Sequence, residues 1–318
     1  MVKCCVIGKY YYILTMSGPI QPFSLEEEYK KSTKITPEDI KKFRDWVDTQ
    51  PHLPSEHITD MDLILTYHCC HRSSEVSKQV LDLHYTLKTL FGNFFKDRVV
   101  DDKILNTYSL YVLTLLEVRA YDNSAVLFCR LLDTDPKKFI FAEALRACLM
   151  LVDIWQYEQG TWPGFVILID LDQCTLGHIA RLDLQSVQQF LYFLQEAMLL
   201  KIKSLHFLNA PSFMDKLMMI LRPFLKKELL DMLFIHQVGS KTLEKYLPME
   251  GLPKGAGGQY KSLVQCRDDV VAKVKNSKDF ILAENKKRVV EAKRPGKPKT
   301  ISDIFGGVEG SFKKLDID

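Results

Sequence analysis

Two carboxylates, Asp170 and Asp172, are the residues that most invite a catalytic interpretation. They directly follow an apolar stretch, residues 165–169, at the strand end where α/β active sites often lie. The alternative is that they form a turn and a cap for residues 175–184. The sequence has no G-x-S-x-G, H-E-x-x-H, phosphate-binding loop or G-x-G-x-x-G motif. We therefore expect no catalytic residues and no enzymatic activity.

The run His68-Cys69-Cys70-His71 could suggest a metal site. Successive residues on a helix point about 100° apart, so only His68 and His71 could share an ion. A structural zinc site needs four converging ligands, usually from two separated pairs. The eight cysteines include no C-x-x-C, and the chain is too long for a small disulfide framework. We expect no metal, no cofactor and the reduced thiols of a cytoplasmic protein.

Basic residues are distributed unevenly. Six of them fall within residues 201–227, where Asp215 is the only acid: Lys201, Lys203, Lys216, Arg222, Lys226 and Lys227. Residues 286–299 hold seven basic residues and one acid, Glu291. Such clusters attract anionic membranes or simply solvate one face of the protein. The whole chain has 43 basic and 40 acidic residues, a balance that argues against a dedicated nucleic-acid binder.

Two kinds of predicted structure position these residues. After a tail over residues 1–35, three helical patterns over 36–95 predict a small helical subdomain; the first begins at Thr36-Pro37. Over 96–260, apolar strands at about 124–132, 165–169, 202–208 and 233–236 alternate with helices, which predicts an α/β sheet. Residues 261–318 predict one helix and a basic tail. A second methionine, Met16, raises the possibility that residues 1–15 are an extension outside the fold.

Two of these elements are unusually apolar. The strand 165–169 is apolar at every position, which is typical of a central strand covered on both faces. Phe165, Ile167 and Ile169 share one of these faces. The helix over 212–225 is amphipathic, with Met214, Leu217, Met218, Leu221 and Leu225 on one side and Met219 in the middle of its polar side. By themselves, these patterns fit ordinary core packing equally well.

Several motifs between residues 164 and 258 occur together in one known family. They are the sequence I-D-L-D at residues 169–172 followed by Gly177-His178, the runs IKSLHFLNAP and RPFLKK, and the two final pairs Leu252-Pro253 and Gly257-Gly258. With these motifs, the chain resembles the CRAL-TRIO lipid-binding family, in the branch of alpha-tocopherol transfer protein and cellular retinaldehyde-binding protein. The resemblance implies an α/β fold with a small N-terminal helical subdomain and a mixed five-stranded sheet, whose helices enclose an apolar cavity closed by a mobile helix.

The resemblance also assigns roles to residues. It places a hydrophobic ligand against Ala147, Leu151, Phe165, Ile167, Ile169, Phe190 and Phe193, and against the lid residues Met214, Leu217, Met218 and Leu221. In the tocopherol-transfer branch, four basic residues bind a phosphoinositide headgroup beside the lid. Two of those positions fall on Lys201 and Lys203, and the other two fall on Glu228 and Met232, which cannot bind phosphate. Arg222, Lys226 and Lys227 are nearby substitutes.

Two functional hypotheses follow. The first is a cytoplasmic carrier that exchanges one hydrophobic molecule, such as a tocopherol or a retinoid, at membranes that it contacts transiently, with Met219 dipping into the bilayer. The second is a membrane-signalling module that recognises phosphoinositides through Lys201 and Lys203. No apolar run reaches the ~18 residues of a membrane span.

Overall fold

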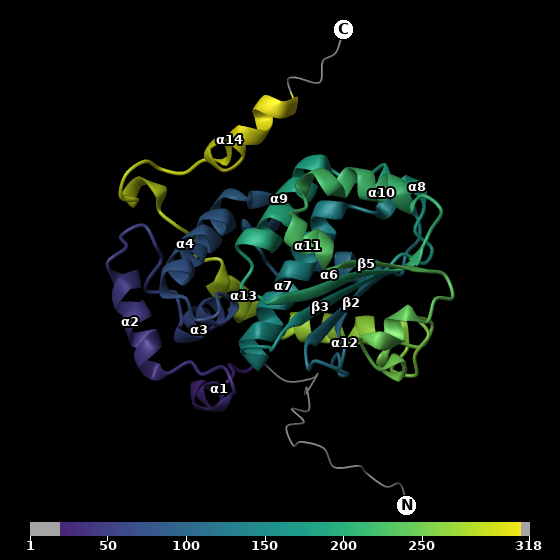
Figure 1. The fold of residues 1–318 in the computed structure, drawn as a ribbon, viewed down its shortest axis with the longest axis horizontal. Helices are drawn as coiled ribbons and strands as arrows, with labels where there is room; N and C mark the ends of the chain where they lie inside the picture. Colours follow the sequence, from purple (N-terminus) through teal and green to yellow (C-terminus); the bar gives the residue numbers. More distant parts are fainter. Residues whose placement is uncertain (1–19, 313–318) are drawn as a thin grey trace, which may run out of the picture.

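The computed structural model describes residues 20–312, which form a helical N-terminal part beside a sheet covered by helices (Figure 1). The N-terminal helices begin at side-chain caps. Thr36 and Thr59 each accept a hydrogen bond from a backbone N–H three residues ahead and close a capping box, and Ser73 caps the fourth helix. The helices are α1 (Leu25–Lys30), α2 (Pro37–Asp48), α3 (Asp60–Cys69), α4 (Ser74–Leu90) and α5 (Gly92–Phe95).

Five strands form one sheet in the order β1-β2-β3-β4-β5. β1 runs antiparallel to β2, and the other neighbours are parallel, so the sheet is mixed as the family resemblance implies. The strands are β1 (Tyr111–Leu115), β2 (Ala125–Leu131), β3 (Phe165–Asp170), β4 (Ile202–Ala210) and β5 (Leu233–Gln237). The patterns along the chain indicated the last four individually, whereas β1 follows a helix without a turn signal.

Helices cover the sheet on one side, and α12 with the chain before it lies on the other (Figure 1). Successive strand residues alternate between these sides. Leu127, Phe165 and Ile167 belong to the cluster under α7 and α9, whereas Val126 and Val166 belong to the opposite one. The helices are α6 (Asp102–Leu110), α7 (Phe141–Gln159), α8 (Leu176–Ile179), α9 (Leu184–Glu196), α10 (Met214–Leu221), α11 (Lys227–Asp231) and α12 (Leu263–Lys275); 3₁₀ turns occur at Pro136–Lys138, Arg222–Phe224, Thr242–Lys245, Met249–Gly251 and Glu291–Lys293.

The described part of the expected tail, residues 20–35, is folded onto the main body. α1 places Glu28 in a fully buried position, where its carboxylate accepts hydrogen bonds from the hydroxyl and the N–H of Thr161. Lys31 donates to the carbonyls of Gln159 and Thr161 at 2.7 and 2.8 Å. The prediction of a tail was wrong for this stretch, because its docking depends on partners about 130 residues away. Residues 1–15 lie outside the described residues.

The C-terminal part contains two helices that we did not predict, α13 (Lys278–Glu284) and α14 (Ile301–Phe312). Between them, part of the basic run packs against the N-terminal helices, whereas Lys286, Lys293 and Lys297 are exposed. Lys287 pairs with Asp62 at 2.8 Å, and Arg294 pairs with Asp82 at 2.7 Å; both basic side chains are buried. These two ion pairs join the C-terminal part of the chain to the N-terminal helices.

Candidate ligand-binding cavity

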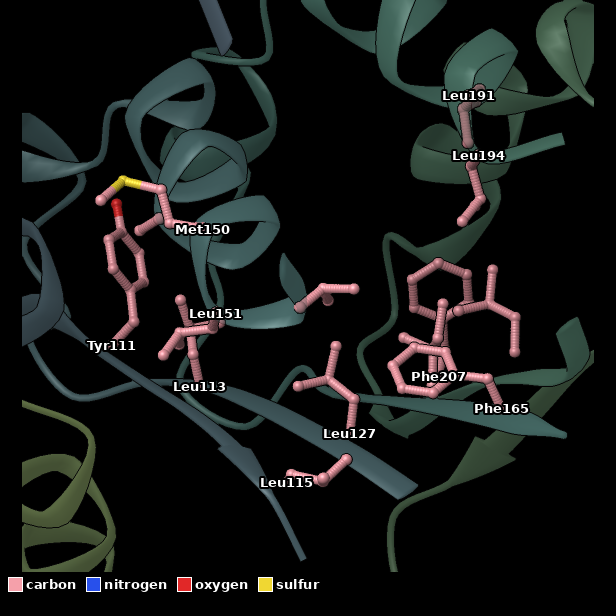
Figure 2. Close-up of a cluster of buried hydrophobic side chains, with 14 of the residues drawn as sticks. Tyr111, Leu113, Leu115, Leu127, Met150, Leu151, Phe165, Leu191, Leu194 and Phe207 are labelled. Carbon is pink, nitrogen blue, oxygen red and sulfur yellow. The ribbon is translucent and has the colours of Figure 1, made fainter. Parts of the chain in front are cut away.

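An apolar cavity of about 250 Å³ lies between the sheet and the helices that cover it. In the core beside it, Leu127, Phe165 and Phe207 of the sheet rise toward Leu191 and Leu194 of α9 (Figure 2). Every second residue of the strands points this way because the side chains of a strand alternate between its faces. The strand residues that line the cavity are mainly Tyr111, Leu113, Leu127, Cys129, Leu131, Phe165, Ile167, Ile169, Leu205 and Phe207.

Six of the eleven predicted ligand-binding residues line this cavity: Phe165, Ile167, Ile169, Phe190, Leu217 and Leu221. The other five do not line it. Met214 and Met218 of α10 are buried in the surrounding core, as are Ala147 and Leu151 of α7. Phe193 of α9 packs in a different cluster, with its ring centroid 5.0 Å from that of Phe95. Whether any of the eleven touches a ligand stays a prediction.

The differences on α7 and α9 are errors of helical phase. α7 lines the cavity with Phe141, Ala144, Leu145, Cys148 and Val152, and α9 lines it with Val187, Phe190, Leu191 and Leu194. Both sets follow the three- and four-residue spacing of one helix face. Ala147 and Leu151 each precede a lining residue by one position, which turns them about 100° away. The spacing from Phe141 onward was a signal that could have found the correct face.

Polar side chains close the end of the cavity next to the sheet edge. Arg130 donates to Asp170 at 3.0 Å and to the carbonyl of Gly255 at 2.8 Å, and it also contacts Asp172. The second oxygen of Asp170 accepts hydrogen bonds from the Asn209 amide at 2.8 Å and from the N–H of Asp172 at 3.0 Å. Both Asp170 oxygens therefore hold the turn after β3, which favours the structural interpretation of this pair over the catalytic one.

α10 closes the cavity opposite the sheet. Leu217 and Leu221 face inward, whereas Met219 is 69% exposed on the outer side. The segment that follows α10 is held by Gln195 of α9. The Gln195 side chain donates to the carbonyl of Phe224 at 3.0 Å and accepts from the N–H of Lys226 at 2.7 Å. The start of α10 has no side-chain cap at Phe213. The helix is thus an apolar cover with one fastened end.

Residues 111–258, which contain the whole sheet and the cavity, match the protein family described as CRAL/TRIO domain. This part of the chain forms a CRAL/TRIO domain. The preceding residues, 32–105, match a different family, described as Pinta-like, UBA domain.

Two curated relatives are similar to more than half of this chain. The mouse (Mus musculus) "Alpha-tocopherol transfer protein-like" is 26% identical over 62% of this chain and 53% of its own length. "Clavesin-1" of Xenopus laevis is 22% identical over 75% of this chain and 74% of its own. The chain thus spans about half of the first relative. The solved structure titled "Crystal structure of Sfh5" is 12% identical, with a TM-score of 0.41, over 88% of this chain and 99% of that one.

The predicted phosphoinositide residues of the CRAL/TRIO domain lie at the start of β4 and in the segment from the end of α10 into α11. Lys201 and Lys203 flank the start of β4, and the parallel neighbour β5 begins just after Met232. Burial lowers the pKa of Lys201, and the neighbouring positive charges of Lys203 and Arg72 lower it further. Lys226 is engaged with Glu196, which raises its pKa.

The remaining members of that set differ in their surroundings. Arg222 and Lys227 are exposed beside α10, and neither forms an ion pair among the described residues. Glu228 is exposed next to them and brings a negative charge into the region. Whether these residues bind a phosphoinositide stays a prediction.

His68 belongs to the contact between α3 and the CRAL/TRIO domain, whereas His71 is exposed. Nε2 of His68 hydrogen-bonds to the carbonyl of Trp162 at 2.9 Å, and burial lowers the His68 pKa to about 4. Within residues 20–312, no group of three or more His, Cys, Asp or Glu side chains is arranged to hold a metal ion. In the same range, no helix is both long and apolar enough to cross a membrane.

Proposed function

We propose that the protein binds one hydrophobic small molecule, such as a tocopherol, a retinoid or a similar lipid, in the CRAL/TRIO cavity and transfers it between membranes in the cytoplasm. The cavity itself is the observation that carries this proposal, because its lining is almost entirely apolar. Its volume of about 250 Å³ is slightly below the ~300–1,000 Å³ of typical ligand pockets. We infer that α10 moves outward when a whole lipid enters.

The energy of burial is sufficient for useful affinity. A lipid that buries about 500 Å² of apolar surface at about 25 cal/mol per Å² gains about 12 kcal/mol. With an association cost of about 4 kcal/mol, about 8 kcal/mol remains, which corresponds to binding in the micromolar range. The names of the relatives, which include alpha-tocopherol transfer protein-like, agree with this class of ligand. No reaction of the ligand is proposed.

A titration of purified protein with fluorescent tocopherol or with retinaldehyde tests the proposal. We expect saturable binding of one ligand per chain. Leu221→Trp should weaken binding, because Leu221 lines the cavity, whereas Ile220→Trp on the same helix is the matched control, because Ile220 does not line it. Partition without saturation, or equal binding by both variants and the wild type, would contradict a ligand in this cavity.

A second candidate function is recognition of phosphoinositide membranes, and the positive charge around Lys201 favours it. Each basic residue near an anionic surface contributes about 1 kcal/mol. Vesicle sedimentation with and without a phosphoinositide should show weaker binding for the double variant Lys201→Glu with Lys203→Glu. The double variant Lys286→Glu with Lys293→Glu changes the charge equally at exposed positions of the C-terminal run and serves as the control. Equal binding by both would count against this candidate.

A further inference from the structure

His178 is a polar residue in the apolar lining of the cavity. It lies on α8, which packs tightly on the 3₁₀ turn at 136–138: a Cβ on Gly177 would come within 2.9 Å of Pro136. Next to this contact, the His178 ring lies nearly perpendicular to the ring of Phe139, and the two ring centroids are 5.5 Å apart. The His178 side chain is 1% exposed, so water does not reach it.

The hydrogen bonds of His178 determine which ring nitrogen carries the proton. The backbone N–H of Thr175 donates to Nδ1 at 3.1 Å, and the Thr175 hydroxyl lies 3.0 Å from the same atom. A backbone N–H can only donate, so Nδ1 is an unprotonated acceptor. Burial lowers the pKa of His178, which keeps the ring neutral near pH 7. A neutral imidazole with an accepting Nδ1 carries its hydrogen on Nε2.

This Nε2–H has no hydrogen-bond partner among the described residues. Seven buried side-chain nitrogen or oxygen atoms in residues 20–312 lack a partner, and of these only Nε2 of His178 belongs to a residue that lines the cavity. The Nδ1 edge of the ring faces the turn at Thr175, so the Nε2 edge is directed the other way. A buried donor without a partner destabilises a protein, and a ligand acceptor would remove this cost.

We propose that His178 recognises the ligand by donating a hydrogen bond from Nε2 to a single uncharged oxygen, a carbonyl or a hydroxyl, on an otherwise apolar molecule. This inference rests on the proposed ligand-binding function of the cavity. The partner must accept, because Nε2–H can only donate. It is uncharged, because one neutral donor cannot compensate the cost of burying a carboxylate. The ligand class is therefore an apolar aldehyde, ketone, ester or alcohol, bound with its oxygen toward α8.

Three ligands with one carbon skeleton test the inference: farnesal with a carbonyl, farnesol with a hydroxyl and farnesene without oxygen. Each competes with diphenylhexatriene, an apolar fluorescent probe that needs no hydrogen bond. We expect the wild type to bind the two oxygenated ligands about 10- to 100-fold more tightly than farnesene. His178→Phe keeps a flat ring without the donor, and His178→Gln keeps a donor. Leu176→Ala alters an exposed residue of the same helix that does not line the cavity and serves as the control.

The outcomes separate this inference from the proposed function. Support requires that the preference disappears in His178→Phe, returns in His178→Gln and persists in Leu176→Ala. If the wild type binds diphenylhexatriene but shows no preference among the three ligands, the role of His178 is wrong while the cavity function stands. The same preference in His178→Phe and in the wild type also overturns it. If the probe does not bind at all, the proposed function fails and this inference fails with it.

Discussion

Replacing Met219 by glutamate should slow the transfer of ligand to and from membranes while leaving equilibrium affinity unchanged. Met219 is 69% exposed on α10, although its neighbour Met218 is only 5% exposed. Its side chain therefore contributes little to the closed protein. It is available to enter the bilayer surface when α10 opens, as apolar side chains of interfacial helices do. Leu217, which lines the cavity on the same helix, stays in place.

The expected slowing of ligand transfer can be worked out from the exposed fraction of the Met219 side chain. Full burial of a methionine side chain is worth about 1.5–3 kcal/mol. With 69% still exposed in the closed protein, insertion gains about 1–2 kcal/mol, which corresponds to about a 5- to 30-fold change in the population docked on the membrane. A glutamate loses this gain and is also repelled by anionic lipids, so the slowing should be at least about 5-fold.

Energy transfer from a fluorescent tocopherol to acceptor vesicles measures the transfer rate, and a titration without vesicles measures affinity. Val264→Glu is the matched control: Val264 is 49% exposed on α12, on the opposite side of the sheet from α10 (Figure 1). It makes the same kind of change and should leave the transfer rate intact. Equal transfer rates for Met219→Glu and the wild type would refute the reasoning, and so would a parallel loss of affinity.

Three further predictions concern α10 and two buried ionisable residues. Gln195→Ala removes the two hydrogen bonds that fasten the end of α10, at about 1 kcal/mol each, so stopped-flow release of bound ligand should become about 5- to 30-fold faster; an unchanged release rate would contradict this. Burial and the neighbouring His236 lower the pKa of His206 to about 4, so its contribution to stability is complete above its ordinary pKa of 6.5 and is lost as the pH falls toward 4. Urea unfolding should show this decline, and His206→Phe should reduce its slope. Glu284→Ala removes the carboxylate 3.0 Å from the buried Lys88 and leaves Asp153, at 3.7 Å, as its remaining partner, so the free energy of unfolding should fall by about 3–5 kcal/mol; a loss below about 1 kcal/mol would show that Asp153 compensates Lys88.

Local patterns predicted the order of most elements, because those patterns act over a few residues. The capping residues Thr36 and Thr59 begin helices where expected, and the strand after Phe165 is covered on both faces. Positions such as Ile167 followed from simple alternation along that strand. β1 was not found individually, because its sequence continues directly from α6 and carries no turn residues to mark a boundary.

The cavity-facing residues of α7 were harder to predict for a physical reason. α7 is buried on most of its circumference, with Ala147, Leu149, Met150 and Leu151 all nearly inaccessible. An apolar pattern shows that such a helix is buried, but it does not distinguish a neighbour that is protein from one that is an empty cavity. That distinction depends on how α7 is rotated against the sheet, which its packing partners decide.

The sequence by itself determined the two-part organisation, the apolar central strand, the Met-rich amphipathic helix and the resemblance to the CRAL-TRIO family, because each depends on residues close together along the chain. Only the tertiary structure decided three other properties. It paired Lys287 and Arg294 of the C-terminal basic run with Asp62 and Asp82, docked α1 on the turn at Thr161, and left Nε2 of His178 without a partner among the described residues. Each of these depends on contacts between distant segments or on the absence of such contacts, which local sequence patterns do not encode.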